Sequence, residues 1–112
     1  MKDYKAILVG NGTMGARHRA RFEGNGVRFV KVLDLDAPQW LDSSASADLE
    51  KERPDFAVVA SPASAHYEYA KFFLEHKIPV LVEKPLAVSA DQANELVELS
   101  ERNGALLFVA QS

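Results

Sequence analysis

A glycine-rich segment near the N-terminus has the spacing of a phosphate-binding loop. Residues 10–15 read Gly-Asn-Gly-Thr-Met-Gly, and they lie between a continuous apolar run and a helical pattern. In this setting Gly10 permits a tight turn, Gly12 lets the backbone approach a pyrophosphate, and Gly15 lets the helix pack close to the strand. The amides at the start of the helix then face the phosphate charge. The segment predicts a dinucleotide-binding loop, and the alternative is a glycine turn without a ligand.

An acidic residue follows this loop at the distance that dinucleotide binding requires. Asp34 closes a second apolar run, residues 27–33, and lies 19 residues after Gly15. A carboxylate in this place accepts hydrogen bonds from the adenosine ribose and repels a 2′-phosphate, so it favours NAD over NADP. Asp36 is a weaker candidate for the same role. The alternative for Asp34 is a solvated acid at a strand end.

Short apolar runs alternate with amphipathic segments along the chain, which is typical of βαβ units and a parallel sheet. Segment 35–53 is broken by Pro38 and several serines, so at most short helices fit there. We therefore predict an α/β fold, a Rossmann-like, doubly wound, mainly parallel sheet in three αβα layers. It forms a single domain, 1–112, with an abbreviated second helix region. The expected strands are 6–9, 27–33, 56–60, 79–82 and 105–110, and the expected helices are about 13–23, 64–76 and 90–102.

Composition excludes several classes of protein. The 112 residues contain no cysteine, which excludes a disulfide scaffold, a thiolate zinc site and a cysteine nucleophile, and no metal site is expected. The net charge of −3 gives no reason to expect a nucleic-acid partner. The basic residues of the first helix are expected to form a solvated face. They are Arg17, His18, Arg19 and Arg21.

No apolar run approaches the length of a membrane span, and no signal peptide is evident at the N-terminus. We therefore expect no membrane partner and a cytoplasmic location.

Three further segments go beyond a generic dinucleotide-binding domain. The glycine loop extends to His18, Glu83-Lys84-Pro85 follows the fourth predicted strand, and a Ser-Pro-Ala-Ser-Ala-His segment at 61–66 follows the third. Together with Asp34, this ordered set resembles the Gfo/Idh/MocA family, the group of glucose–fructose oxidoreductase and inositol dehydrogenase. The resemblance covers nearly the whole chain and corresponds to the N-terminal domain of that family.

The resemblance implies a role for each matching segment. The loop residues would hold the pyrophosphate, Asp34 the adenosine ribose, and residues 61–66 the middle of the dinucleotide. Lys84 would contact the nicotinamide ribose or the substrate as the catalytic lysine, and the Lys84–Pro85 bond is a candidate for the cis form. The alternatives are a surface lysine and, for His66, a ring satisfied by local hydrogen bonds. The implied cofactor-binding residues are Gly10, Asn11, Gly12, Thr13, Met14, Gly15, Asp34, Ser61, Pro62, His66, Glu83, Lys84 and Pro85.

The resemblance implies an NAD(P)-dependent oxidoreductase that transfers hydride between nicotinamide and a sugar-like or polyol hydroxyl. NAD is preferred to NADP. Segment 35–53 is shorter than the corresponding unit of the family, which leaves the adenine-side wall open, and Trp40 is expected to help fill it.

The C-terminal substrate domain of the family, which carries acid–base residues and most of the oligomer interface, is absent from the sequence. We therefore expect this domain alone to be inactive, and we leave a homo-oligomer open. The alternative is a stand-alone nucleotide-binding or NAD(H)-sensing module without catalysis. A structural protein with a vestigial loop is the third interpretation.

Overall fold

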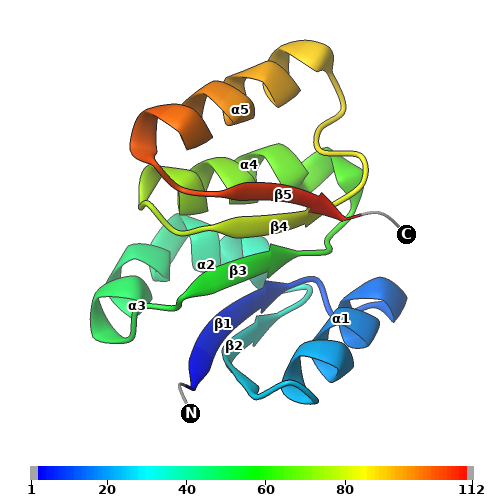
Figure 1. The fold of residues 1–112 in the computed structure, drawn as a ribbon, viewed down its shortest axis with the longest axis vertical. Helices are drawn as coiled ribbons and strands as arrows, with labels where there is room; N and C mark the ends of the chain where they lie inside the picture. The colour runs from blue at the N-terminus through cyan, green and yellow to red at the C-terminus, as the bar shows by residue number, and fades with distance from the viewer. Residues whose placement is uncertain (1–2, 111–112) are drawn as a thin grey trace.

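The computed structural model describes residues 3–110, and the strands within that range form one parallel sheet in the order β2-β1-β3-β4-β5 (Figure 1). This arrangement confirms the predicted α/β, Rossmann-like fold. The strands are β1 (Tyr4–Val9), β2 (Val27–Leu33), β3 (Phe56–Val59), β4 (Val80–Glu83) and β5 (Leu107–Ala110). The helices are α1 (Thr13–Glu23), α2 (Ala37–Ser43), α3 (Ala45–Lys51), α4 (Ala63–Glu75) and α5 (Ala90–Asn103).

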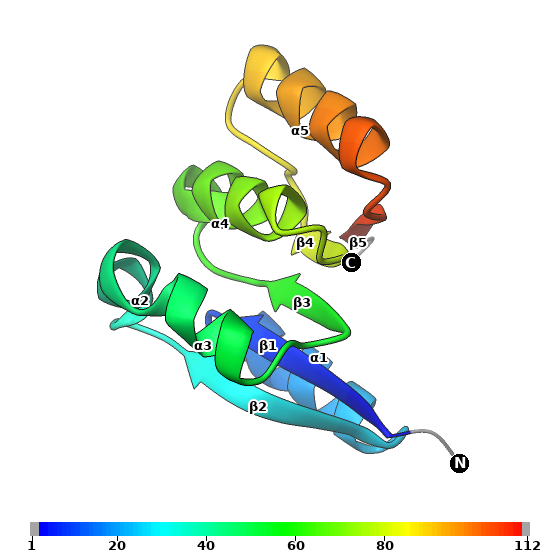
Figure 2. The same ribbon diagram turned by 90° about the vertical axis from the view of Figure 1, so that its left-hand side faces the viewer.

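Helices cover both faces of the sheet, which places the central strands in a dry interior. Figure 2 shows α1 on one side of the sheet and α2, α3 and α4 on the other. Continuous apolar runs suit such strands because both faces are buried. In β1, Ile7 and Val9 join the core beneath α4, whereas Ala6 and Leu8 are buried outside that cluster.

The main core lies between the sheet and α4. Phe73 and Leu74 of α4 are fully buried there, and Leu96 of α5 packs into the same cluster. Ser89 caps the start of α5, because the Gln92 amide donates to Ser89 Oγ at 3.2 Å. Gly104, with φ of +65°, ends the helix in the left-handed conformation that favours glycine.

The segment between β2 and β3 forms two seven-residue helices, α2 and α3, as the broken pattern predicted. The expectation that Trp40 fills an adenine-side wall was wrong. Its ring is 4% exposed and packs against Phe72 and Phe73 of α4. A large aromatic ring on so short a helix gains more free energy from burial in the core than from lining a solvent-filled site.

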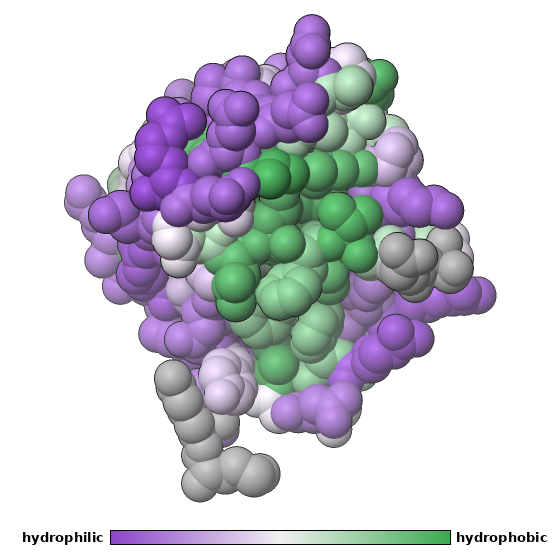
Figure 3. Space-filling view, turned by 45° about the horizontal axis from the view of Figure 1, so that its top comes forward, coloured by the Kyte–Doolittle hydropathy of each residue, from purple (hydrophilic) through white to green (hydrophobic). Residues whose placement is uncertain are grey.

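One part of the sheet surface lies outside the cover of α1. An apolar groove of about 440 Å³ runs along it, and Figure 3 shows apolar side chains gathered in the centre of this view with polar side chains around them. The groove is lined by Tyr4, Phe22, Asp55, Phe56, Pro79, Val80, Leu81 and Phe108. Within residues 3–110, every helix is too short or too polar to cross a membrane.

Replacing Phe73 by Ala should lower the free energy of unfolding by about 3–5 kcal/mol, because it opens a cavity where the ring is fully buried. Urea denaturation followed by circular dichroism measures the loss. Leu35, which is 95% exposed, provides the control, and Leu35→Ala should change stability by less than about 0.5 kcal/mol. Similar losses in the two variants would contradict the described core.

Candidate cofactor-binding site

The candidate site lies where the strand order reverses. The strands β1 and β3 are neighbours, but the chain leaves β1 towards β2 and leaves β3 towards β4. Loops that follow such strands diverge and open a crevice at the carboxyl edge of the sheet, where α/β proteins bind ligands. At Gly10 the two loops meet, since a Cβ there would lie 2.6 Å from the carbonyl carbon of Ala60 and from the amide nitrogen of Ser61.

The three glycines of the loop have different surroundings. Gly10 has φ of +92° and no room for a side chain, and a Cβ on Gly15 would lie 1.8 Å from the carbonyl oxygen of Gly10. A Cβ on Gly12 would meet nothing within 4 Å, and the backbone angles there suit any residue. The fold therefore requires Gly10 and Gly15, whereas the open space at Gly12 is available to a ligand.

In the two loops that meet at Gly10, two buried polar atoms have no hydrogen-bond partner among the described residues. They are Oδ1 of Asn11, in the loop after β1, and Oγ of Ser61, in the loop after β3. Burying a polar atom without a partner costs free energy, so such atoms are rare and call for an explanation. A ligand rich in hydroxyl and phosphate groups would supply the missing partners, and the residues present therefore fit a dinucleotide.

Asp34 lies beside the glycine loop at the end of β2. The amide of Gly10 donates to the carbonyl of Leu33 at 2.7 Å, which ties the loop to that strand end. The side chain of Asp34 is exposed, whereas Asp36 Oδ1 already accepts the Asp34 amide at 3.0 Å. Of the two acids, Asp34 has the carboxylate better placed for a ligand.

His18 is buried, and the expectation that it belongs to a solvated basic face was wrong. Its Nε2 hydrogen-bonds to Oε1 of Glu83, the last residue of β4, and the two residues are 8% and 9% exposed. The sequence held a signal for this burial, because His18 follows Gly15 by three positions and therefore shares its sheet-facing side of α1. A buried carboxylate needs such a partner, since an unpaired one is costly.

His66 of α4 is 2% exposed and bridges two loops. Its Nδ1 lies 2.7 Å from the carbonyl oxygen of Pro85, and its Nε2 lies 2.6 Å from that of Ser61. Both partners only accept, and a neutral ring has one N–H to give, so the tautomer decides which of the two nitrogens donates. Both ring nitrogens are thus used within the protein.

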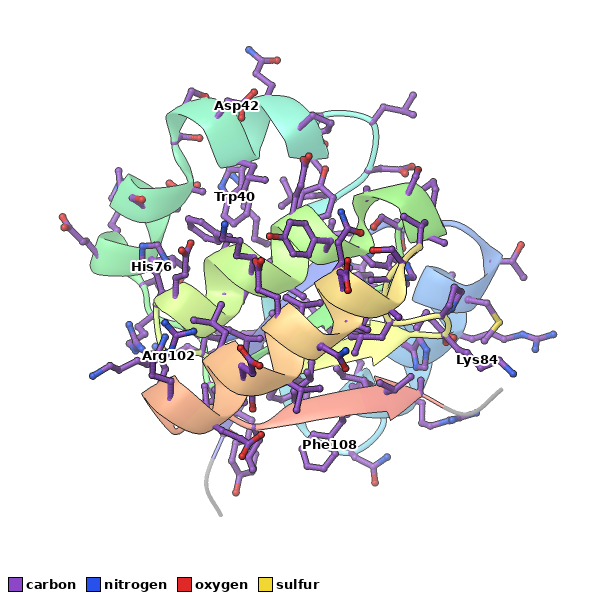
Figure 4. All side chains as sticks on the ribbon, turned by 90° about the horizontal axis from the view of Figure 1, so that it is seen from above. Trp40, Asp42, His76, Lys84, Arg102 and Phe108 are labelled. Atoms are coloured by element: carbon purple, nitrogen blue, oxygen red, sulfur yellow. The ribbon has the colours of Figure 1, made fainter. Side chains whose placement is uncertain are left out.

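Lys84 lies in the sequence between Glu83, which contacts His18, and Pro85, which contacts His66. The Lys84–Pro85 bond is cis, as the resemblance suggested, and both residues are exposed. Among residues 3–110 the Lys84 ammonium has no hydrogen bond or ion pair, so it is free to meet a ligand. In Figure 4, Lys84 lies at the end of the molecule opposite to His76 and Arg102.

A second cleft, of about 570 Å³, lies away from these loops, beside β2 and α3. Two ion pairs lie in it, Lys31 with Asp48 at 3.4 Å and Lys5 with Glu52 at 3.9 Å. The Trp40 indole donates to Asp48 at 2.6 Å, and this hydrogen bond lowers the pKa of the Asp48 carboxyl. Two of its acids, Asp48 and Glu52, thus already have cationic partners in the cleft. Among residues 3–110, no group of three or more His, Asp or Glu side chains could hold a metal ion.

The chain matches a family described as oxidoreductase family, NAD-binding Rossmann fold, over residues 4–111. It is 34% identical to inositol 2-dehydrogenase of Rubrobacter xylanophilus over 89% of this chain and 32% of that protein. It is 30% identical to 2,7-anhydro-N-acetylneuraminate hydratase of Mediterraneibacter gnavus over 96% of this chain and 31% of that protein. The chain thus spans about a third of the length of these curated relatives.

A solved structure with a similar fold contains the expected kind of ligand. It is GenD2 from gentamicin A biosynthesis in complex with NAD, with a TM-score of 0.85 and 26% identity, covering 98% of this chain and 35% of that one.

Replacing Gly15 by Ala should lower the free energy of unfolding by about 3 kcal/mol, because the new methyl group would overlap the carbonyl of Gly10. Replacing Gly12 by Ala should change it by less than about 1 kcal/mol, because the methyl group enters open space. Urea denaturation of both variants tests this contrast. Equal losses would show that both glycines serve the fold.

Proposed function

Since this chain belongs to the Gfo/Idh/MocA oxidoreductase family, we propose that its NAD-binding domain serves hydride transfer between NAD and a sugar-like or polyol hydroxyl. One observation supports this most strongly. The two loops that meet at Gly10 contain the open space at Gly12 and two buried polar atoms, on Asn11 and Ser61, that have no partner among the described residues. Neither feature serves the fold, and a dinucleotide would use both.

The chain would hold the two halves of the dinucleotide with different loops. The amides at the start of α1 would bind the pyrophosphate, since the N-terminus of a helix attracts anions. Asp34 would accept from the adenosine ribose, and Ser61 would donate towards the middle of the molecule. The residues proposed for the pyrophosphate are Gly10, Asn11, Gly12, Thr13, Met14 and Gly15.

The residues after β3 and β4 would shape the nicotinamide side. Pro62, His66, Glu83 and Pro85 would form and hold the wall around Lys84. When bound, nicotinamide supplies the hydride acceptor or donor. The Lys84 cation would stabilise negative charge on the oxygen of the reacting hydroxyl as its proton leaves.

We propose that substrate recognition and acid–base groups lie outside this chain, because it matches about a third of its relatives. On this basis the domain alone binds the cofactor without turnover.

Titration with NADH tests the binding proposal. Trp40 is the single tryptophan, so excitation of Trp40 and detection of nicotinamide emission report binding directly. Saturable binding is expected for the wild-type chain, and Gly12→Val should abolish it because the side chain fills the space of the pyrophosphate. Gly24→Ala, at the far end of α1, is the control and should bind normally. Unchanged NADH affinity in Gly12→Val would refute the assignment of this loop.

Replacing Asp34 by Ala should weaken NAD binding by about tenfold or more, because hydrogen bonds to a charged group are lost. NADP binding should fall less or improve, since a repulsive charge beside the 2′-phosphate is removed. Calorimetric titration with each nucleotide provides the comparison, and Asp42→Ala, at an exposed acid of α2, is the matched control with little expected effect. Equal losses for NAD and NADP would place Asp34 away from the ribose.

A further inference from the structure

Lys84 belongs to a segment with little backbone support of its own. Residues 85–88 form no backbone–backbone hydrogen bond with other described residues, and regular structure resumes only at α5. A long side chain on such a segment samples many positions unless something else holds the backbone. The two neighbours of Lys84, Glu83 and Pro85, make the contacts that restrain this backbone.

On the N-terminal side of Lys84, a residue of α1 restrains the backbone through a hydrogen bond. Glu83 is buried at the end of β4, and its carboxylate is bound by Nε2 of His18. His18 lies one turn after the glycine loop, in the helix that the loop begins. The pair therefore connects the loop expected to bind pyrophosphate with the residue that precedes Lys84.

On the C-terminal side of Lys84, the hold comes from α4, on the opposite face of the sheet (Figure 2). Nδ1 of His66 lies 2.7 Å from the carbonyl oxygen of Pro85, and its Nε2 lies 2.6 Å from that of Ser61. The ring is almost fully buried, so water competes little with either bond. His66 thus connects the loop after β3 with the residue that follows Lys84.

We propose that His18 and His66 are positioning residues that hold Lys84 from the two faces of the sheet. His18 acts through the side chain of Glu83, and His66 acts through the backbone of Pro85. The proposal rests on the proposed function in one respect, namely that Lys84 is the lysine of the nicotinamide side. The restraint of the backbone around Lys84 by His18 and His66 does not depend on any ligand.

The two histidines use different ring nitrogens towards the Lys84 segment, and this difference provides a matched test. The amide nitrogen of Asn occupies the place of Nδ1, and that of Gln occupies the place of Nε2. His66→Asn should therefore keep the bond to Pro85, and His66→Gln should lose it. At position 18 the pattern reverses, so that His18→Gln keeps the bond to Glu83 and His18→Asn loses it.

Backbone ¹⁵N relaxation of the 112-residue chain measures the effect without ligand. In the wild type, the amides of Lys84 and Leu86 should have order parameters near those of rigid backbone, about 0.85. His66→Gln and His18→Asn should lower them to below about 0.6, whereas His66→Asn and His18→Gln should keep them near the wild-type value. The amides of Val58 and Phe73 should stay rigid in all four variants.

The opposite effects of Asn and Gln at positions 66 and 18 decide whether the proposal holds. A merely structural role predicts that loss follows side-chain size, so that both Asn variants would be worse, or that rigidity falls across the whole domain. Either result would overturn the positioning role. So would unchanged order parameters at Lys84 and Leu86 in His66→Gln and His18→Asn.

Nucleotide affinities then test whether His66 acts on the ligand through Lys84. His66→Gln should weaken NADH binding about three- to tenfold but leave ADP binding unchanged, because ADP lacks the nicotinamide half. In a Lys84→Ala background the same change should have no further effect on NADH, as expected for residues that act through one another. Additive losses would overturn the link to Lys84. Absence of NADH binding by the wild-type chain would refute the proposed function, and the order parameters would still decide the positioning role.

Discussion

The close approach of two backbone segments at Gly10 is the constraint on which the site depends. Gly10 leaves no space between the ends of β1 and β3, and Gly15 stacks α1 directly on the same turn. Because of this contact, the N-terminus of α1 points towards the crevice. The same contact sets the position at which the loop after β3 begins. Any side chain at either position would separate the segments, and the amides of the loop would then lose their common direction. The arrangement of the site thus requires glycine, which has no Cβ atom, at both Gly10 and Gly15.

Polar contacts extend this arrangement across the sheet. The amide of Gly10 binds the end of β2, His18 binds the end of β4, and His66 spans the loops after β3 and β4. Each contact joins strand ends that are distant in the sequence. Because most of these groups are buried, each bond is protected from water and constrains the loops more firmly than a surface contact would. Lys84 remains exposed beside these contacts, which is the arrangement expected of a group that meets a ligand.

The fold and the main loops could be predicted from the sequence because their signals are local. Apolar runs marked the strands to within about two residues, and the spacing of the glycines marked the start of α1. The partners of His18 and Trp40 were not predictable in the same way. His18 meets a residue 65 positions away, and Trp40 packs against α4, so both depend on which helix covers which face. Composition suggested a solvated helix, but the packing of α1 on the sheet buries one of its histidines.

The wide separation of the site segments along the chain has a consequence for folding. Residues 10–15, Asp34, Ser61 and Lys84 come together only after three successive strand-to-strand crossovers have formed. No partly folded fragment contains the complete site, so a ligand that needs all of these segments binds only the native state. Such a ligand stabilises the entire chain by mass action, by about 2.7 kcal/mol at a concentration 100 times its dissociation constant. Cofactor supply in the cell would therefore also govern how long the domain survives proteolysis.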